Sequence, residues 1–99
     1  MCGIAGVFLF EGPRTGMANR IHRMTDTIRH RGPDDEGYCL INTKSGAYRL
    51  AAGADSVAQI RETQPLITEL QQEHFDLALG HRRFAILDLT VGGHQPYFD

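Results

Sequence analysis

The chain has 99 residues, of which 41% are hydrophobic and 22% charged, an ordinary composition for one modest soluble domain. Its net charge of −2 and aromatic content of 8% argue against a nucleic-acid binder or a protein attracted to anionic membranes. No apolar run approaches the roughly 20 residues of a membrane span, and no secretory signal opens the chain. We therefore expect a cytoplasmic protein.

The first predicted element is a buried strand over Gly3–Phe10, which follows Met1 and Cys2 directly. Removal of Met1 would leave Cys2 with a thiol and a free α-amino group on the same carbon. That amino group has a pKa of about 7.7–8.0, so near neutrality it can take the thiol proton. One residue would then supply both nucleophile and base. The alternative is that Met1-Cys2 is an ordinary start with a small second residue.

A helix is predicted next, from Gly16 to Arg29. Its apolar residues recur at spacings of four, three and four, which places them on one face: Met17, Ile21, Met24 and Ile28. Thr15 is the expected N-cap. Gly32, in a left-handed conformation and followed by Pro33, is expected to end the helix.

The segment 29–37 is dense in charge and turn residues, and it predicts a loop leading into a strand from Gly37 to Asn42. Its three consecutive acids, residues 34–36, lack the alternation and the later glutamate of a calcium loop, so no metal site is predicted. Cys39 lies within the expected strand. Without a secretory signal we interpret it as a buried, inert thiol and not as a disulfide partner of Cys2.

A hairpin turn over 43–46 is expected to lead into a short strand, 47–50. The stretch 51–75 has a weak pattern: a short helix capped by Asp55 or Ser56, a break at Pro65, and a second short helix over 66–70. We interpret it as a surface insertion without chemistry. Strands are then expected over 77–81 and 84–89, with His81-Arg82-Arg83 between them. The order strand, helix, then mostly strands favours the α+β class.

Four segments taken in order carry a resemblance: MCGIAGV at 1–7, RHRGPDDEG at 29–37, GHRRFAILDL at 80–89 and GGHQP at 92–96. Together they resemble the start of the glutamine amidotransferase domain of glutamine-hydrolysing asparagine synthetases. The segments cover under half of the residues, but they reach from the first to nearly the last. The stretch 43–76 carries none of the resemblance.

The resemblance implies an N-terminal nucleophile hydrolase fold with α-β-β-α layers, incomplete in this chain. It implies that Met1 is removed and that the Cys2 sulfur attacks the side-chain amide of glutamine. The resulting thioester releases ammonia and is hydrolysed to glutamate. In the family, ammonia passes to a C-terminal synthetase domain, absent from this sequence, where ATP and magnesium activate aspartate. The implied partners are glutamine, that domain and, as one option, a second copy in a homodimer; no cofactor is implied for this segment itself.

The resemblance also suggests site residues. Cys2 matches the nucleophile, and Arg83 matches the arginine that holds the α-carboxylate of glutamine, for which a planar guanidinium is well suited. The strand whose backbone lines the glutamine pocket is matched by Phe84, Ala85, Ile86 and Leu87, with Phe84 standing where leucine is usual. Arg82 is interpreted as a surface or salt-bridge residue. His81 is interpreted as structural, because the α-amine already serves as the base.

The family's oxyanion-hole asparagine and glycine, and the aspartate that binds the substrate's α-amino group, come later than Asp99. We therefore expect residues 1–99 to be the N-terminal part of the amidotransferase domain, with the rest of that domain absent. Two alternatives stay open. One is a class II amidotransferase that delivers ammonia to another acceptor, and the other is a catalytically incompetent fragment.

Overall fold

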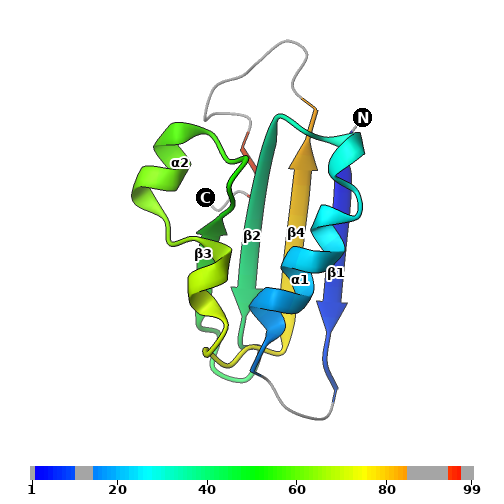
Figure 1. The fold of residues 1–99 in the computed structure, drawn as a ribbon. Helices are drawn as coiled ribbons and strands as arrows, with labels where there is room; N and C mark the ends of the chain where they lie inside the picture. The colour runs from blue at the N-terminus through cyan, green and yellow to red at the C-terminus, as the bar shows by residue number, and fades with distance from the viewer. Residues whose placement is uncertain (1, 11–14, 85–93, 97–99) are drawn as a thin grey trace.

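The computed structural model describes residues 2–10, 15–84 and 94–96. Within them, four strands form one antiparallel sheet in the order β1-β4-β2-β3 (Figure 1). The strands are β1 (Gly3–Phe8), β2 (Asp35–Ile41), β3 (Tyr48–Ala52) and β4 (Leu77–Arg83). The helices are α1 (Met17–Asp26) and α2 (Ala58–Thr63), with 3-10 turns η1 (Arg29–Arg31) and η2 (Ile67–Leu70). The predicted α+β class is confirmed.

The first and last strands lie side by side, since β1 and β4 form an antiparallel pair in which Gly3 lies opposite Arg82. On its other side β4 pairs with β2, where Arg83 lies opposite Asp35. The start of β1 and the end of β4 therefore meet at one end of the sheet, as Figure 1 shows.

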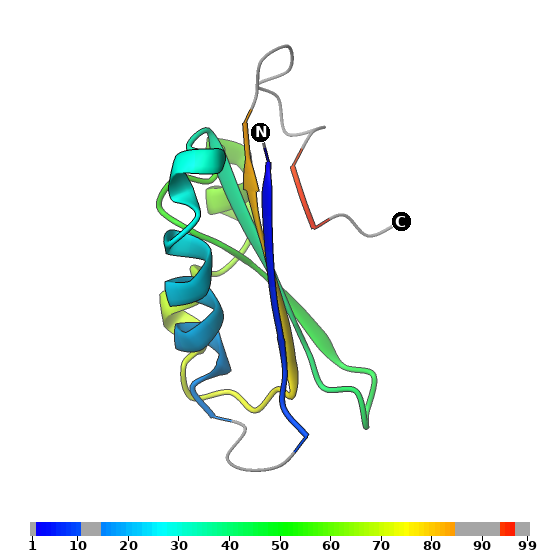
Figure 2. The ribbon, with the colours of Figure 1, turned by 90° about the vertical axis from the view of Figure 1, so that its right-hand side faces the viewer.

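The helices pack on one face of the sheet, and residues 94–96 lie on the opposite side (Figure 2). We call this opposite side the open face. The core under the helices combines side chains from α1, η2 and the strands: Met17, Ala18, Ile21, Tyr38, Leu40, Ala51, Ile67, Leu70, Phe75 and Ala78. The open face leaves large apolar side chains exposed, among them Ile4, Phe8 and Leu79. The expectation of a fully buried strand over Gly3–Phe10 was therefore wrong: β1 ends at Phe8 and is buried on one face only.

Helix α1 sits close against β4 because Gly80 has no side chain. A Cβ atom built at Gly80 would collide with Oγ1 of Thr25, and Ile21 Cγ1 would lie 3.3 Å away. Ile21 and Thr25 are both fully buried on α1. The glycine thus sets the distance between the helix and the sheet.

The predicted start of the first helix is right to within one residue, but its predicted cap and its predicted end were wrong. The residue before α1 is Gly16, with a φ of 81°, and the expected Thr15 cap is not made. The helix ends at Asp26, three residues early, because the Thr27 hydroxyl donates to the Met24 carbonyl at 2.6 Å and competes with continued helix formation. Gly32 is not a left-handed cap, since its φ is −150°.

Both short helices expected in the middle of the chain are present, but the N-cap of α2 is Val57, not Asp55 or Ser56. The interpretation as a surface insertion was wrong in part, because Ile67 and Leu70 belong to the core. Strand β4 continues through Arg83, so residues 81–83 do not separate two strands. Most of the strand expected at 84–89 lies outside the described residues. No helix in the described part of the chain has the length and apolar character needed to cross a membrane.

Candidate active site

Cys2 and Arg83 lie at the same end of the sheet. Cys2 is exposed and directly precedes β1, while Arg83 is the last residue of β4. Because Gly3 lies opposite Arg82, one further step of the antiparallel register places Cys2 opposite Arg83. Strand side chains alternate between faces, so both residues belong to the open face together with Ile4. The β1–β4 pair thus brings together the predicted nucleophile and the predicted carboxylate ligand.

Arg83 is nearly buried and lies beside a second charged residue that sequence reasoning did not select. Nη1 of Arg83 is 3.8 Å from Oδ2 of Asp35, the first residue of β2. The same Oδ2 atom is 2.7 Å from Nδ1 of His94. Oδ1 of Asp35 accepts the backbone N–H of Val57 at 3.1 Å. Asp35 is therefore the centre of a buried polar group that joins β2, β4, the start of α2 and residue 94.

His81 lies on the same face, opposite Ile4 in β1 and Gly37 in β2. Burial lowers the pKa of His81, and the charges of His94 and Arg83 lower it further, while Asp35 opposes them. The imidazole is therefore held in its neutral form at neutral pH. Its structural role stays a prediction.

Arg82 is a buried residue, so its interpretation as a surface arginine was wrong and that as a salt-bridge residue is confirmed. Its side chain is 0% exposed and lies on the helix face. Nε donates to the Gly32 carbonyl at 2.9 Å, and Nη2 donates to Oδ2 of Asp55 at 2.8 Å. Nη1 lies 2.9 Å from Oε2 of Glu36. The hydrogen bond from Arg82 also holds the pKa of Asp55 below its usual value.

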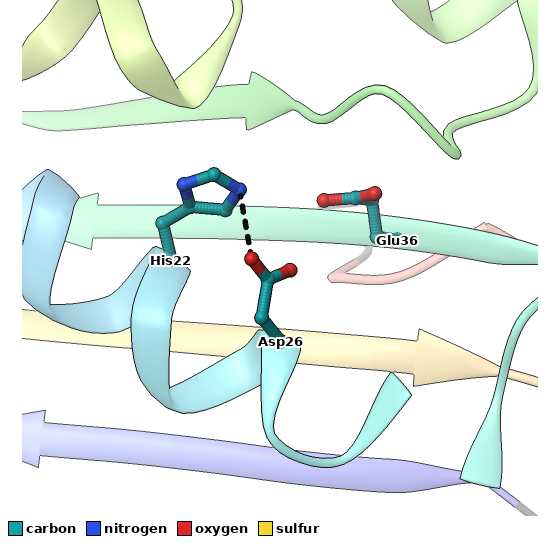
Figure 3. A group of neighbouring side chains, drawn as sticks. All are labelled: His22, Asp26 and Glu36. Carbon is teal, nitrogen blue, oxygen red and sulfur yellow. Dashed lines mark ion pairs between the residues drawn. The ribbon is translucent and has the colours of Figure 1, made fainter. Parts of the chain in front are cut away.

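Three potential metal ligands gather on this helix face: His22, Asp26 and Glu36 (Figure 3). Their ligand atoms lie within 4.8 Å of one another, and Nε2 of His22 is 3.6 Å from Oδ2 of Asp26. Glu36, however, already accepts the Tyr38 hydroxyl at 2.6 Å, and the Arg82 ion pair occupies its other oxygen. The Glu36 carboxylate thus belongs to the polar network around Arg82, while His22 and Asp26 pair with each other.

The remaining predicted site residues are only partly described. Phe84 follows Arg83 and is exposed, while Ala85, Ile86 and Leu87 lie outside the described residues. Cys39 is a free, buried cysteine, and burial raises the pKa of its thiol, as its interpretation as an inert residue requires. Asp35 and His94 are the residues that sequence reasoning missed. Both occur in the quoted segments, but nothing in their spacing of 59 positions indicates contact.

Comparison with known proteins adds a family to this geometry. Residues 1–75 match the family described as "Glutamine amidotransferase domain". The chain is also 33% identical over 96 residues to a Methanocaldococcus jannaschii protein named for glutamine-hydrolysing asparagine synthetase. That match covers 97% of this chain but only 13% of the relative. No solved structure matches the chain.

Proposed function

Because the chain belongs to the glutamine amidotransferase domain family, we propose that it carries the nucleophile and a substrate anchor of a glutamine-hydrolysing site. The observation that carries this proposal is the meeting of Cys2 and Arg83 at one end of the β1–β4 pair, on the open face. The exposure of Cys2 supports its role, since a nucleophile must be reached by its substrate.

In the proposed reaction, Met1 is removed and the α-amine of Cys2 takes the thiol proton. The sulfur then attacks the side-chain carbonyl carbon of glutamine. The C–N bond breaks as the α-ammonium returns a proton to the nitrogen, which leaves as ammonia. Water, deprotonated by the same amine, attacks the γ-glutamyl thioester, and glutamate and the free thiol are released. No metal or redox cofactor takes part in these steps.

Arg83 is proposed to bind the α-carboxylate of glutamine. A guanidinium presents parallel N–H donors that match the two oxygens of a carboxylate. Arg83 lies across the strand pair from Cys2. One glutamine molecule would therefore place its α-carboxylate at Arg83 and its side-chain amide at Cys2. The backbone of Phe84, Ala85, Ile86 and Leu87 is proposed to line the pocket beyond Arg83.

For the fold, we propose that the sheet and its helices form one α-β half of the α-β-β-α layers of an N-terminal nucleophile hydrolase. The exposed Ile4, Phe8 and Leu79 support a second β layer over the open face, because a contiguous apolar surface is usually covered.

The ammonia acceptor is proposed to be aspartate, activated with ATP and magnesium in a synthetase domain. The name of the relative supports this acceptor, but the chain spans 13% of that protein, so the assignment concerns the whole protein and not these residues. A class II amidotransferase with another acceptor is the second candidate. Release of free ammonia is common to both, and only the choice of acceptor separates them.

The test is ammonia and glutamate formation from glutamine by the protein that carries this chain, with the N-terminal mass recorded on the same sample. Cys2→Ala should abolish release. Cys39→Ala is the matched control, because it removes the other, buried cysteine, and its activity per folded molecule should match the wild type. Equal release by the wild type and Cys2→Ala would overturn the proposal. No release from a folded, processed wild-type sample would instead favour the catalytically incompetent alternative.

A further inference from the structure

We propose that His22, Asp26 and Glu36 form a binding site for a divalent transition-metal ion such as Zn²⁺. The site lies on the helix face of the sheet, whereas Cys2 and Arg83 belong to the open face. A bound ion would tie the second half of α1 to the first residues of β2. The proposal does not depend on the reaction of Cys2.

Two elements bring the three ligands together. His22 and Asp26 are four residues apart in α1, so their side chains are neighbours on one side of the helix. Glu36 is the second residue of β2, and its carboxylate points toward the two helix residues (Figure 3). One ligand atom from each residue lies within 4.8 Å of the other two. The run of three acids in the sequence did not indicate this site, because two of its ligands come from the helix.

The distance between His22 and Asp26 fits two ligands of one ion better than a hydrogen bond. Nε2 of His22 lies 3.6 Å from Oδ2 of Asp26. An N–H···O hydrogen bond measures about 2.7–3.2 Å. Two tetrahedral ligands, each about 2.1 Å from a zinc ion, are about 3.4 Å apart. The pair is thus already spaced as zinc ligands are, and the Asp26 side chain, which is 53% exposed, has room to adjust toward Glu36.

The buried Glu36 carboxylate keeps one acceptor position for a cation. Its Oε2 accepts the Asp55 N–H at 2.9 Å and faces Nη1 of Arg82 at 2.9 Å, so both lone pairs of this oxygen are used. Among the described residues, Oε1 accepts the Tyr38 hydroxyl alone, which leaves it one lone pair. Tyr38 also meets the ring of His22 edge-on, with ring centroids 6.0 Å apart. One buried tyrosine therefore orients two of the ligands, as the outer partners of metal ligands commonly do.

The space and the ligand types indicate the kind of ion. The three side chains line a hollow of about 410 Å³, which admits an ion and the water molecules that complete its coordination. Magnesium and calcium take oxygen ligands, whereas an imidazole nitrogen suits zinc and its neighbours in the first transition row. One nitrogen and two carboxylate oxygens therefore favour a zinc-like ion.

The charges around the hollow leave one carboxylate without a guanidinium partner. Arg82 pairs with Glu36 and Asp55, and Arg29 pairs with Asp55. Within the described part of the chain, Asp26 makes its ion pair with His22 and with no arginine. Three carboxylates against two guanidiniums leave one negative charge, which a divalent cation would offset.

A simpler interpretation is that His22 and Asp26 form an ordinary pair on the helix surface and that Glu36 only balances Arg82. The two interpretations differ in what zinc does to His22. A surface pair would bind zinc no better than any other exposed histidine. A three-ligand site would bind zinc at low concentration and would lose affinity when Asp26 is neutralised.

The experiment measures how fast diethyl pyrocarbonate modifies each histidine of the whole protein that carries this chain, with and without ZnCl₂. Fragment-ion mass spectrometry reports His22 separately from His30 and His74, two exposed histidines that serve as internal controls. The Cys2→Ala protein is the background, so that the exposed thiol does not compete for zinc. The thermal midpoint without zinc checks that each variant is folded.

Micromolar ZnCl₂ should slow the modification of His22 about tenfold or more, because a metal-bound imidazole has no free lone pair for the reagent. The rates at His30 and His74 should stay within about twofold. MgCl₂ at the same concentration should not protect His22. Equal rates at His22 with and without zinc, equal protection of all three histidines, or protection by MgCl₂ would overturn the inference.

Ligand variants test the other two residues. Asp26→Asn removes an anionic ligand and should raise the half-protecting zinc concentration about tenfold or more. Glu36→Gln keeps an acceptor for the Tyr38 hydroxyl and should have the same effect. Glu62→Gln, an exposed substitution on α2, is the matched control and should leave the concentration unchanged. An unchanged concentration in the folded Asp26→Asn protein would overturn the inference, and the proposed function would stand.

Discussion

Arg82 and Arg83 are neighbours in β4, but their side chains lie on opposite faces of the sheet. Arg82 is buried under the helices between Glu36 and Asp55. Arg83 lies on the open face beside Asp35. The alternation of strand side chains thus gives two adjacent, identical residues different tasks. Arg82 connects parts of the fold, and Arg83 lies on the same face of the sheet as Cys2.

Substitution of Arg82 should lower the stability of the folded protein without a direct effect on the site. Arg82→Met leaves the buried Glu36 carboxylate without its ion-pair partner, and we expect the free energy of unfolding to fall by about 3–5 kcal/mol. Urea denaturation measures the change. Arg23→Met, an exposed substitution on α1, is the control and should stay within about 0.5 kcal/mol. Equal stability of the two variants would show that the buried network contributes little.

Substitution of Arg83 should act mainly on substrate binding. Arg83→Lys keeps the positive charge but loses the planar fork, so the KM for glutamine should rise about tenfold or more while kcat changes less. Steady-state ammonia release measures both constants. A fall in kcat at unchanged KM would contradict carboxylate binding by this side chain.

The approach of α1 to β4 can be tested through Gly80. Gly80→Ala should lower the free energy of unfolding by about 1–3 kcal/mol, because the new methyl group meets Thr25 Oγ1. That oxygen is buried and has no hydrogen-bond partner among the described residues, so Thr25→Ala should cost little and should partly rescue Gly80→Ala. Gly6→Ala on β1 is the control, since its new methyl group would meet the end of the Leu79 side chain at 3.3 Å and the Ala78 carbonyl oxygen at 3.8 Å, with no collision. Additive losses in the double variant would argue against the steric explanation.

His81 should make stability depend on pH. Its pKa is lowered in the folded state, mainly by burial, so the unfolded chain binds the proton more readily. The stability contributed by neutral His81 is complete above the pKa of histidine in the unfolded chain, about 6.5. It is lost as the pH falls from that value through the lower pKa of His81 in the folded protein. The difference in unfolding free energy between the wild type and His81→Asn should therefore shrink from pH 8 to pH 5. The charges facing this ring, Asp35, Arg83 and His94, are the same in both proteins. A difference independent of pH would show that His81 does not titrate as described.

Local patterns in the sequence predicted local structure well. Of the four apolar residues predicted to share one face of the first helix, Met17 and Ile21 are buried, whereas Met24 is exposed and Ile28 lies beyond the end of α1. Cys2 and Arg83 were selected from their motifs. The end of α1 was missed because the Thr27 hydroxyl donates to the Met24 carbonyl in the last turn, which apolar periodicity does not report. The buried position of Arg82 was missed because its partner Asp55 lies 27 residues away, in a segment without clear periodicity.

Long-range pairing accounts for the part of the site that the sequence did not reveal. In the sequence, Asp35 is one of three consecutive acids in a predicted turn, and His94 follows two glycines in a predicted loop. Their contact depends on the register of β2 against β4 and on the space above Gly37. Neither property is encoded in residues that are neighbours in the chain.

The most direct test of the account is the mass of the N-terminal peptide after the protein is mixed with glutamine and quenched in acid. We predict a peptide that begins at Cys2 and carries a γ-glutamyl thioester, which disappears on treatment with hydroxylamine. Cys39→Ala should give the same adduct. A processed peptide that stays unmodified while glutamate accumulates, or an adduct on any other residue, would contradict the assignment of Cys2 as the nucleophile.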